Sequence, residues 1–369
     1  MFDAITTLFS SALGRRSSLS VPILDGALKP NNLLEQAPVL AEHPGLEDLA
    51  IGPDGALLAA CGDAVVRVAA DGALAPVATF DRPVTALAVL ADGTLAVGLG
   101  NAVVVGAGGA GARTVASLDG KPLVAVNALH AAADGALLVS DGSATRPYPQ
   151  WSHDLMEKGR TGRLVRYEPA GGAALTLAAG LGYAFGALAD GGRRVLVSES
   201  WRHQVGLVEG GRTRPAVSAL PGYPCRMTAA AGGGFWLSLF ACRTQLVEFV
   251  LGETDYRRDM MRTVDPKYWV APALSSGEDF REPLQGGSVK QMGILKPWAP
   301  PRSYGLVVRF DADFNPRYSL HSRTGGRHHG VVAVAERGDD LFVLSKGAGR
   351  ILRLGIAEIE AAASQGVMA

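Results

Sequence analysis

Hydrophobic and polar residues alternate in short runs along most of the chain, and these runs repeat one pattern. The stretches that begin at Gly45, Val84 and Val126 each hold an alternating run, an Asp-Gly pair and a second apolar run. Alternation with a period of two predicts a β-strand with one buried face. Asp-Gly supplies the positive φ that a tight hairpin needs. Each stretch is therefore predicted to form a β-hairpin.

Three less regular copies of the pattern follow, beginning at Ala184, Tyr223 and His329. Most copies continue into a third apolar run, such as GRLVRYEP from Gly162, and a fourth run leads into the next copy. Sandwiches also contain alternating strands, but the first three copies share one register, which favours a propeller. Four strands in each of six copies predict an all-β protein, a six-bladed β-propeller.

The sixth copy lacks a fourth run, because the chain ends in IAEIEAAASQGVMA. The run APVLAEH, from Ala37, directly precedes the first copy and is expected to complete the last blade. Such closure leaves no strand edge exposed. Residues 37–369 are thus assigned to the propeller and residues 1–36 to an N-terminal extension. The extension is expected to contain a short amphipathic helix that packs on the body or, alternatively, makes peripheral membrane contact; its apolar face comprises Phe2, Ile5, Leu8, Phe9 and Leu13.

Two insertions interrupt the repeat. Residues 145–162 widen the third blade, and residues 251–303 separate strands of the fifth. The second insertion holds the only substantial helical pattern, around ETDYRRDMMRTV. Long insertions in compact folds usually carry function or cover a site. We interpret residues 251–303 as a lid over one end of the channel, with a structural flap as the alternative.

Charge and cysteine content narrow the class of protein. Lysine and arginine total 35, as do aspartate and glutamate, so no net field attracts a polyanion and no nucleic-acid partner is expected. Three cysteines do not make a disulfide framework. Asp3 and the late arginines of the N-terminus are unlike a signal peptide, so a cytoplasmic location is expected, with a membrane-peripheral or periplasmic one as the alternative.

Several segments resemble strictosidine synthase-like proteins, which belong to the gluconolactonase and paraoxonase type of six-bladed propeller. The segments are LMEKGRTGRLVRYEP (155–169), LPGYP (220–224) and GGFWLSL (233–239), together with Glu47-Asp48-Leu49 and Asn127. The resemblance covers about residues 40–355 apart from the long insertion. It implies hydrolysis of lactones or aryl esters with a calcium ion in the central channel, or, in strictosidine synthase, condensation through a glutamate of the last blade.

The resemblance also places residues at the channel. Counting back seven positions from each of the first three Asp-Gly turns gives Glu47, Thr85 and Asn127, and the same column continues through Phe185, Cys225 and Gly330. Glu47 and Asn127 match a carboxylate and an amide calcium ligand of the family.

The later blades depart from the family pattern. Phe185 stands where the calcium enzymes have an asparagine, and Cys225-Arg226 replaces a segment that carries a carboxylate. Calcium takes six to eight oxygen ligands, so either an ion binds at Glu47 and Asn127 or Arg226 supplies the positive charge instead. Val332 occupies the position of the synthase glutamate, and alkaloid condensation is not expected.

These residues suggest two functions. The first is a hydrolase of small esters or lactones, with Glu47, His328 and His329 as candidate catalytic groups. Asn127, Cys225 and Arg226 are its candidate substrate-binding groups, and Cys225 is either a nucleophile activated by Arg226 or a small buried apolar side chain. The alternative is a non-catalytic propeller that binds a small ligand or serves as a scaffold.

Overall fold

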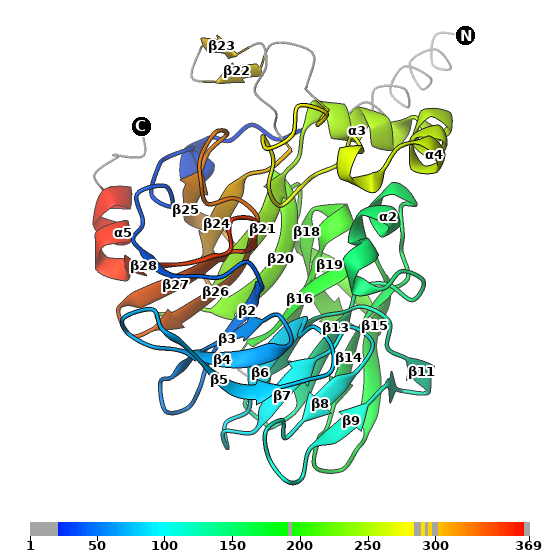
Figure 1. Ribbon diagram of the computed structural model, residues 1–369, viewed down its shortest axis with the longest axis vertical. Coiled ribbons are helices and arrows are strands. Elements are labelled where there is room, and N and C mark those ends of the chain that lie inside the picture. The colour runs from blue at the N-terminus through cyan, green and yellow to red at the C-terminus, as the bar shows by residue number, and fades with distance from the viewer. Residues whose placement is uncertain (1–20, 191–193, 284–288, 292–293, 297–301, 365–369) are drawn as a thin grey trace.

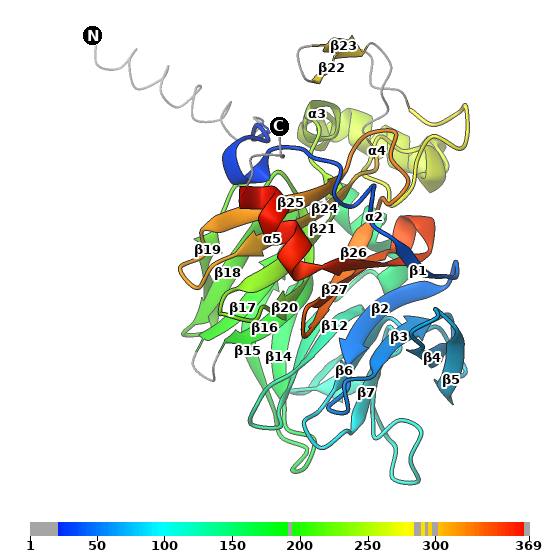
Figure 2. The ribbon, with the colours of Figure 1, turned by 90° about the vertical axis from the view of Figure 1, so that its left-hand side faces the viewer.

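Six four-stranded antiparallel sheets follow one another along the chain and surround a common axis (Figures 1 and 2). The computed structural model describes residues 21–190, 194–283, 289–291, 294–296 and 302–364. The first strand of each blade lies innermost, because these six strands contact one another around the whole ring. The predicted six-bladed propeller is confirmed.

Most blades use four strands that are consecutive in the sequence. Blades one to three are β2–β5 (Leu46–Ile51, Leu57–Cys61, Ala64–Val68, Leu74–Thr79), β6–β9 (Ala86–Val89, Leu95–Gly98, Val103–Val105, Arg113–Val115) and β12–β15 (Val126–Ala131, Leu137–Asp141, Gly162–Tyr167, Ala174–Leu181). A small hairpin, β10 (Ser117–Leu118) and β11 (Lys121–Pro122), connects the second blade to the third.

The last three blades share this plan with two modifications. Blade four is β16–β19 (Ala184–Asp190, Arg194–Glu199, Gln204–Glu209, Arg212–Val217). Blade five joins β20 (Gly222–Ala229) and β21 (Phe235–Cys242) to β24 (Gly305–Phe310) and β25 (Pro316–Ser322), with the long insertion between β21 and β24. Blade six combines β26–β28 (Val331–Arg337, Asp340–Ser345, Arg350–Gly355) with the N-terminal strand β1 (Val39–Glu42).

The N-terminal strand closes the ring as predicted. β1 runs antiparallel to β28, with Val39 opposite Leu352 and Glu42 opposite Arg350. The Arg350 Nε lies 2.9 Å from a Glu42 carboxylate oxygen. This pairing covers the outer edge of the last blade, an edge that would otherwise present unpaired backbone groups.

The Asp-Gly turns have the predicted chemistry. Gly55, Gly93 and Gly135 have φ values of +76°, +86° and +84°, in the left-handed region that glycine adopts without strain. In each turn the preceding aspartate accepts a hydrogen bond from the backbone N–H two residues later, as from Ala56 to Asp54. These contacts are local, which explains why the hairpins could be recognised from sequence.

Helices gather mainly on one side of the propeller, where α2 (Trp151–Met156), α3 (Gln245–Gly252) and α4 (Thr254–Thr263) lie together (Figure 1). The predicted helical segment corresponds to α4, whereas α3 begins before the predicted start of the insertion. A further helix, α5 (Ile356–Ser364), follows the last strand and was not predicted. The expected N-terminal helix lies outside the described residues.

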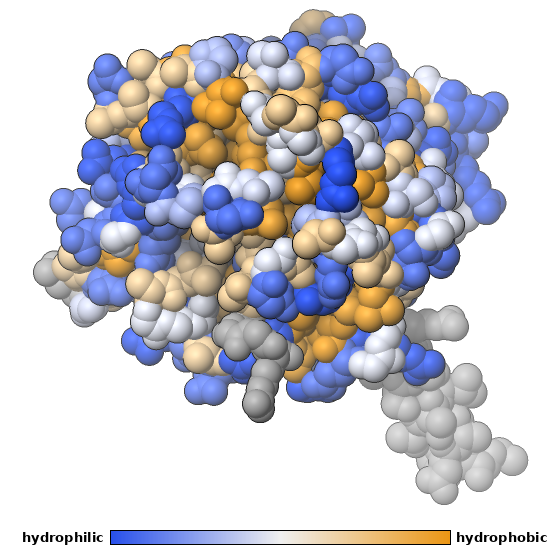
Figure 3. Space-filling model, turned by 90° about the horizontal axis from the view of Figure 1, so that it is seen from below, coloured by the Kyte–Doolittle hydropathy of each residue, from blue (hydrophilic) through white to orange (hydrophobic). Residues whose placement is uncertain are grey.

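The insertion also contains a short antiparallel hairpin, β22 (Val289–Gln291) and β23 (Ile294–Lys296). Among the described residues, no helix has the length and apolar character needed to cross a membrane. Seen from below in Figure 3, apolar and polar residues are intermixed over the surface.

The closing strand offers a direct test of the ring. Ala41 is 5% exposed on β1, whereas Val39 on the same strand is 40% exposed. We expect Ala41→Asp to lower the free energy of unfolding by about 3 kcal/mol, because it buries a carboxylate without a partner. Val39→Asp is the matched control and should cost less than about 1 kcal/mol. Urea denaturation of both variants measures the difference, and equal losses would contradict a closed sixth blade.

Candidate active site

A bulge near the start of each of several inner strands sets the positions that face the axis. In β2 the pairing with β3 passes from Leu46 to Asp48, so Glu47 has no residue opposite it. The same break leaves Asn127, Phe185 and Val332 unpaired in β12, β16 and β26. Such bulges redirect side chains and backbone groups. The common register predicted for Glu47, Asn127 and Phe185 is therefore present.

The predicted column is wrong in the last two blades. The pairing of β20 has two breaks, between Gly222 and Pro224 and between Pro224 and Met227. It is Arg226 that reaches the axis, while Cys225 turns aside. In the sixth blade the axial position belongs to Val332 and not to Gly330. Blades five and six have different turns after the inner strand, so counting back from the turn loses the register there.

Arg226 fills the axis of the propeller and is 6% exposed. Its Nη2 donates to the backbone oxygens of Thr85 and Asn127, each at 2.7 Å. Its Nη1 donates to the backbone oxygens of Glu47, at 3.0 Å, and Val332, at 3.5 Å. One guanidinium thus binds carbonyl groups from four other blades.

Asp48 and Phe185 complete the surroundings of this guanidinium. Asp48 Oδ2 lies 3.1 Å from Arg226 Nε and also accepts from the backbone N–H of Leu87 at 2.9 Å. Burial raises the pKa of Asp48 to about 6, although Arg226 acts in the opposite direction. The Phe185 ring lies 5.3 Å from the guanidinium carbon, at a distance typical of a cation–π contact.

The axial residues do not fit a calcium ion. Asn127 uses its Nδ2 to donate to Ala184 O at 2.6 Å, and only its buried Oδ1 has no hydrogen-bond partner among the described residues. The carbonyl oxygens that converge on the axis are bound by Arg226, whose charge would repel a second cation. The described residues contain no group of three or more histidine, cysteine, aspartate or glutamate side chains arranged to hold a metal.

Glu47 instead joins a polar cluster just above Arg226. Its Oε2 lies 2.5 Å from Lys346 Nζ, and its Oε1 accepts a hydrogen bond from the Tyr148 hydroxyl. Lys346 Nζ also lies 3.3 Å from the Tyr148 oxygen and 5.1 Å from the centre of its ring. Burial and the nearby Glu47 charge raise the pKa of Tyr148 well above its ordinary range, so this phenol stays protonated and donates.

Aromatic side chains surround this polar cluster on the side that faces the insertion. Trp201 stacks on Tyr183 with ring centres 4.5 Å apart, and Phe240 stacks on Tyr223 at 5.5 Å. The resulting pocket leaves about 20 Å³ of space, room for about one water molecule. It is lined by Tyr148, Trp151, Tyr183, Phe185, Trp201, Phe240, Leu274, Val332 and Lys346.

The insertion reaches this pocket through Leu274. The backbone oxygen of Leu274 lies so close to Gly330 and Gly347 that a side chain at either glycine would collide with it. Earlier in the insertion, the buried Trp269 packs against His153 of α2, with ring centres 4.6 Å apart. The predicted lid therefore lies over the end of the channel where Glu47 is found, and its role as a lid stays a prediction.

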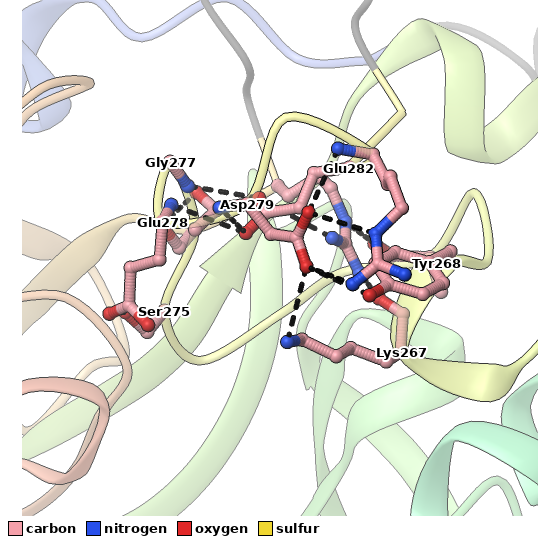
Figure 4. A network of polar contacts seen from close by, with 12 residues as sticks. Lys267, Tyr268, Ser275, Gly277, Glu278, Asp279 and Glu282 are labelled. Carbon is pink, nitrogen blue, oxygen red and sulfur yellow. Dashed lines mark hydrogen bonds and ion pairs between the residues drawn. The ribbon is translucent and has the colours of Figure 1, made fainter.

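A polar network within the insertion holds the Leu274 segment (Figure 4). Asp279 accepts a hydrogen bond from the Tyr268 hydroxyl at 2.8 Å and pairs with Arg281 at 3.0 Å. Glu282 accepts from the backbone N–H of Gly277 at 2.9 Å and pairs with Arg302 at 3.5 Å. These contacts link both sides of the insertion, so the segment is held as one unit.

The other predicted site residues lie away from Glu47. His329 has its ring nitrogens 2.8 Å from Ser303 Oγ and 2.8 Å from the Arg323 backbone oxygen. His328 is buried, and its Nδ1 has no hydrogen-bond partner among the described residues. Burial lowers the pKa of both histidines. Neither ring contacts the Glu47 cluster, although both remain candidates by residue type.

Cys225 has the environment of a buried apolar residue. Its Sγ donates to the Ser238 backbone oxygen at 3.1 Å, between strands and away from the pocket. Burial raises the pKa of the Cys225 thiol to about 12, against a smaller opposing effect of Arg226. Activation of this thiol by Arg226, one of the two readings of the sequence, is not supported by this geometry.

On the far side of Arg226, the lower channel contains a separate cavity of about 170 Å³. Small apolar side chains of the inner strands line most of it, together with Asp48, His130 and Thr228. Burial lowers the pKa of His130 to about 4, so this ring is neutral at physiological pH. Arg226 therefore separates an aromatic upper pocket from a lower channel whose exposed surface is mainly polar.

Sequence reasoning missed Tyr148 and Lys346. Both lie in loops that follow the second strand of a blade, and neither belongs to the repeat. Tyr148 is 101 residues from Glu47 along the chain. Loops after second strands lie at the same end as the starts of inner strands, and this topological signal could have pointed to both residues.

Comparisons with known proteins support the fold. No family model matches the chain, and no curated protein matches its sequence. A gluconolactonase from Xanthomonas campestris has a similar structure, with a TM-score of 0.55 and 16% identity over 86% of this chain and 88% of that one. A candidate gluconolactonase gives 0.54 and 15%, over 89% of this chain and 96% of that one.

A third similar structure is the PQQ-bound aldose sugar dehydrogenase of Streptomyces coelicolor. Its TM-score is 0.52 and its identity is 14%, over 86% of this chain and 96% of that one. At such low identity these likenesses show the fold alone. They bear out the propeller fold, whereas nothing found points to strictosidine synthase specifically.

The attachment of α3 can be tested through its acid dependence. Burial acts to raise the pKa of Glu248, but contacts with His203 and Arg243 hold it at about 2, below the ordinary 4.5. Because the pKa is lower in the folded state, the carboxylate stabilises the fold above about pH 4.5, and this contribution is lost as pH falls toward 2.

We expect the wild type to lose about 2 kcal/mol more than Glu248→Gln between about pH 5 and about pH 3. Denaturant unfolding at both pH values provides the measurement. Glu253→Gln, an exposed substitution next to α3, should follow the wild type. Parallel losses in all three proteins would show that Glu248 does not hold this pKa.

Proposed function

We propose that the protein hydrolyses small esters or lactones in the pocket where Glu47, Tyr148 and Lys346 meet. The observation that carries the proposal is a carboxylate held 2.5 Å from an ammonium group at the base of an apolar, aromatic pocket. Such a site supplies a base for water and a positive charge for an oxyanion, the two requirements of ester hydrolysis.

The reaction needs only groups of this chain and water. Glu47 accepts a proton as a water molecule attacks the carbonyl carbon, and the carbonyl oxygen takes up the electron pair. Lys346 and the Tyr148 hydroxyl stabilise that oxyanion with charge and a hydrogen bond. The intermediate then expels the alcohol oxygen, which recovers the proton from Glu47. A lactone opens in this way to a hydroxy acid.

This mechanism places the positive charge on a side chain. In a calcium-dependent hydrolase the ion polarises the carbonyl, but here the axis is filled by Arg226, whose donors are used by backbone oxygens. Lys346 is partly exposed toward the pocket and supplies the charge instead. We therefore propose a hydrolase that needs no metal.

The pocket indicates the kind of substrate. Its walls are mainly tryptophan, tyrosine and phenylalanine, which bind flat or apolar groups and exclude strongly hydrated ones. Its volume of about 20 Å³ is far too small for a substrate until the Leu274 segment moves. We propose aryl esters or apolar lactones as substrates and movement of the insertion as the route of entry.

One observation favours the alternative of ligand binding without turnover. Both oxygens of Glu47 already have partners, and Arg226 Nη2 lies 3.8 Å from one of them. A carboxylate whose oxygens are both bound by donors has no oxygen free to accept a proton from water. In this second function the pocket binds an apolar ligand that carries an anionic or carbonyl group next to Lys346.

The pocket residues can be tested by turnover of aryl esters and lactones, with and without a chelator. We expect Glu47→Gln and Lys346→Met each to lower kcat/KM by about 10²-fold or more, because each removes a group that acts in the transition state. A chelator should change nothing.

Glu42→Gln on the closing strand is the matched control, because Glu42 is an exposed member of an ion pair. It should retain full activity. Turnover that survives Glu47→Gln refutes the hydrolase. Ligand-induced thermal stabilisation without turnover on any substrate would instead favour the binding function.

The covering segment provides a second prediction. Leu274→Ala removes part of the wall over the pocket, so kcat/KM for bulky aryl esters should rise about tenfold relative to small esters. Leu251→Ala, a matched change at the end of α3 that does not line the pocket, should leave this ratio unchanged. Steady-state kinetics on a pair of esters differing only in the acyl group measure it, and an unaltered ratio would place the substrate elsewhere.

A further inference from the structure

We infer that Arg226 is a built-in cation that closes the centre of the propeller in place of a bound metal ion. This inference concerns the integrity of the ring and does not depend on whether the protein is an enzyme. It begins from three bulged inner strands, where the backbone oxygens of Glu47, Asn127 and Val332 lie within hydrogen-bonding reach of the axis.

The carbonyl oxygens that converge at the centre of the ring need hydrogen-bond donors. The backbone oxygens of Glu47, Thr85, Asn127 and Val332 meet within reach of one group. Buried carbonyls without donors are costly, and their negative ends repel one another. The centre therefore requires a cation or several donors.

The guanidinium of Arg226 matches this requirement donor by donor. It has five N–H groups. The four N–H groups on Nη1 and Nη2 meet the four carbonyl oxygens, while Nε lies 3.1 Å from Asp48 in an ion pair without a hydrogen bond. A lysine could offer three donors only, and from a single nitrogen.

The position of Arg226 links all six blades. The side chain comes from blade five and binds oxygens from blades one, two, three and six, while Phe185 of blade four contacts its face. Gly186 permits this approach, since a side chain there would collide with the backbone of Cys225 and Arg226. Arg226 thus links the blades at the centre of the ring, in addition to the closing strand at its outer edge.

The positive charge of Arg226 is balanced within the protein. Asp48 is buried beside the guanidinium and is held by the backbone N–H groups of Leu49 and Leu87. A metal ion at this place would be in exchange with solution, whereas an arginine is permanently charged and covalently attached. The ring should accordingly be indifferent to chelators.

The experiment compares wild type, Arg226→Met, Arg226→Lys and Arg226→Ala by thermal unfolding, with chelator, with added Ca²⁺ and with guanidinium ion well below denaturing concentration. Wild-type Tm should be the same with chelator or Ca²⁺, and elemental analysis should find no stoichiometric metal. Arg226→Met should lower Tm by about 5 °C, because four carbonyls lose their donor and Asp48 loses its counter-charge. Arg226→Lys should fall between the two.

Guanidinium ion should raise the Tm of Arg226→Ala, which leaves a hole of the right shape, and not that of Arg226→Met, which fills it. If Arg226→Ala does not fold, the other variants provide the test. The inference then requires that Tm falls from wild type through Arg226→Lys to Arg226→Met. The inference is overturned by one Ca²⁺ per wild-type chain with a chelator-sensitive Tm, by an Arg226→Met protein as stable as wild type, or by a folded Arg226→Ala protein that guanidinium does not stabilise.

Discussion

The structure depends on how the centre of the ring is satisfied. Six inner strands approach one axis, and backbone oxygens from four blades meet there, three of them at strand bulges. Buried carbonyls need donors, and a single guanidinium provides them. Asp48 balances the charge, Phe185 covers the face of the group, and Gly186 leaves room for the strand that carries it. These three neighbours match the charge, the flat face and the position of a guanidinium group.

The same group determines what the channel can do. Because Arg226 occupies the axis, the channel is divided into a lower cavity and an aromatic upper pocket. Glu47 is left free of any axial ion and pairs with Lys346, so two cations and two carboxylates make a neutral cluster. A second positive charge, on Lys346, thus lies above the axis, where it lines the upper pocket.

Sequence predicted the repeating part of this arrangement and failed at its non-repeating parts. The Asp-Gly hairpins are local, so the blades and the closing strand could be recognised. The axial register held as far as Phe185 but was lost at Cys225 and Gly330, because a bulge position depends on pairing with the next strand. The pairs of Glu47 with Tyr148 and Lys346 join distant loops, and no local pattern encodes such contacts.

The insertion decides whether the upper pocket is a site or a packed interior. Its wall includes Leu274, and only about 20 Å³ remains beneath it. Leu274 rests by its backbone oxygen on two glycines, and its side chain packs against the hydrophobic cluster that includes Tyr148 and Phe185. The segment itself is tied internally by Asp279 and Glu282. Trp269 of the same insertion is buried in that hydrophobic cluster. Lifting the whole insertion would therefore expose a large apolar surface, whereas movement of the Leu274 turn alone would uncover Glu47 and Lys346 without disturbing the axis that Arg226 holds.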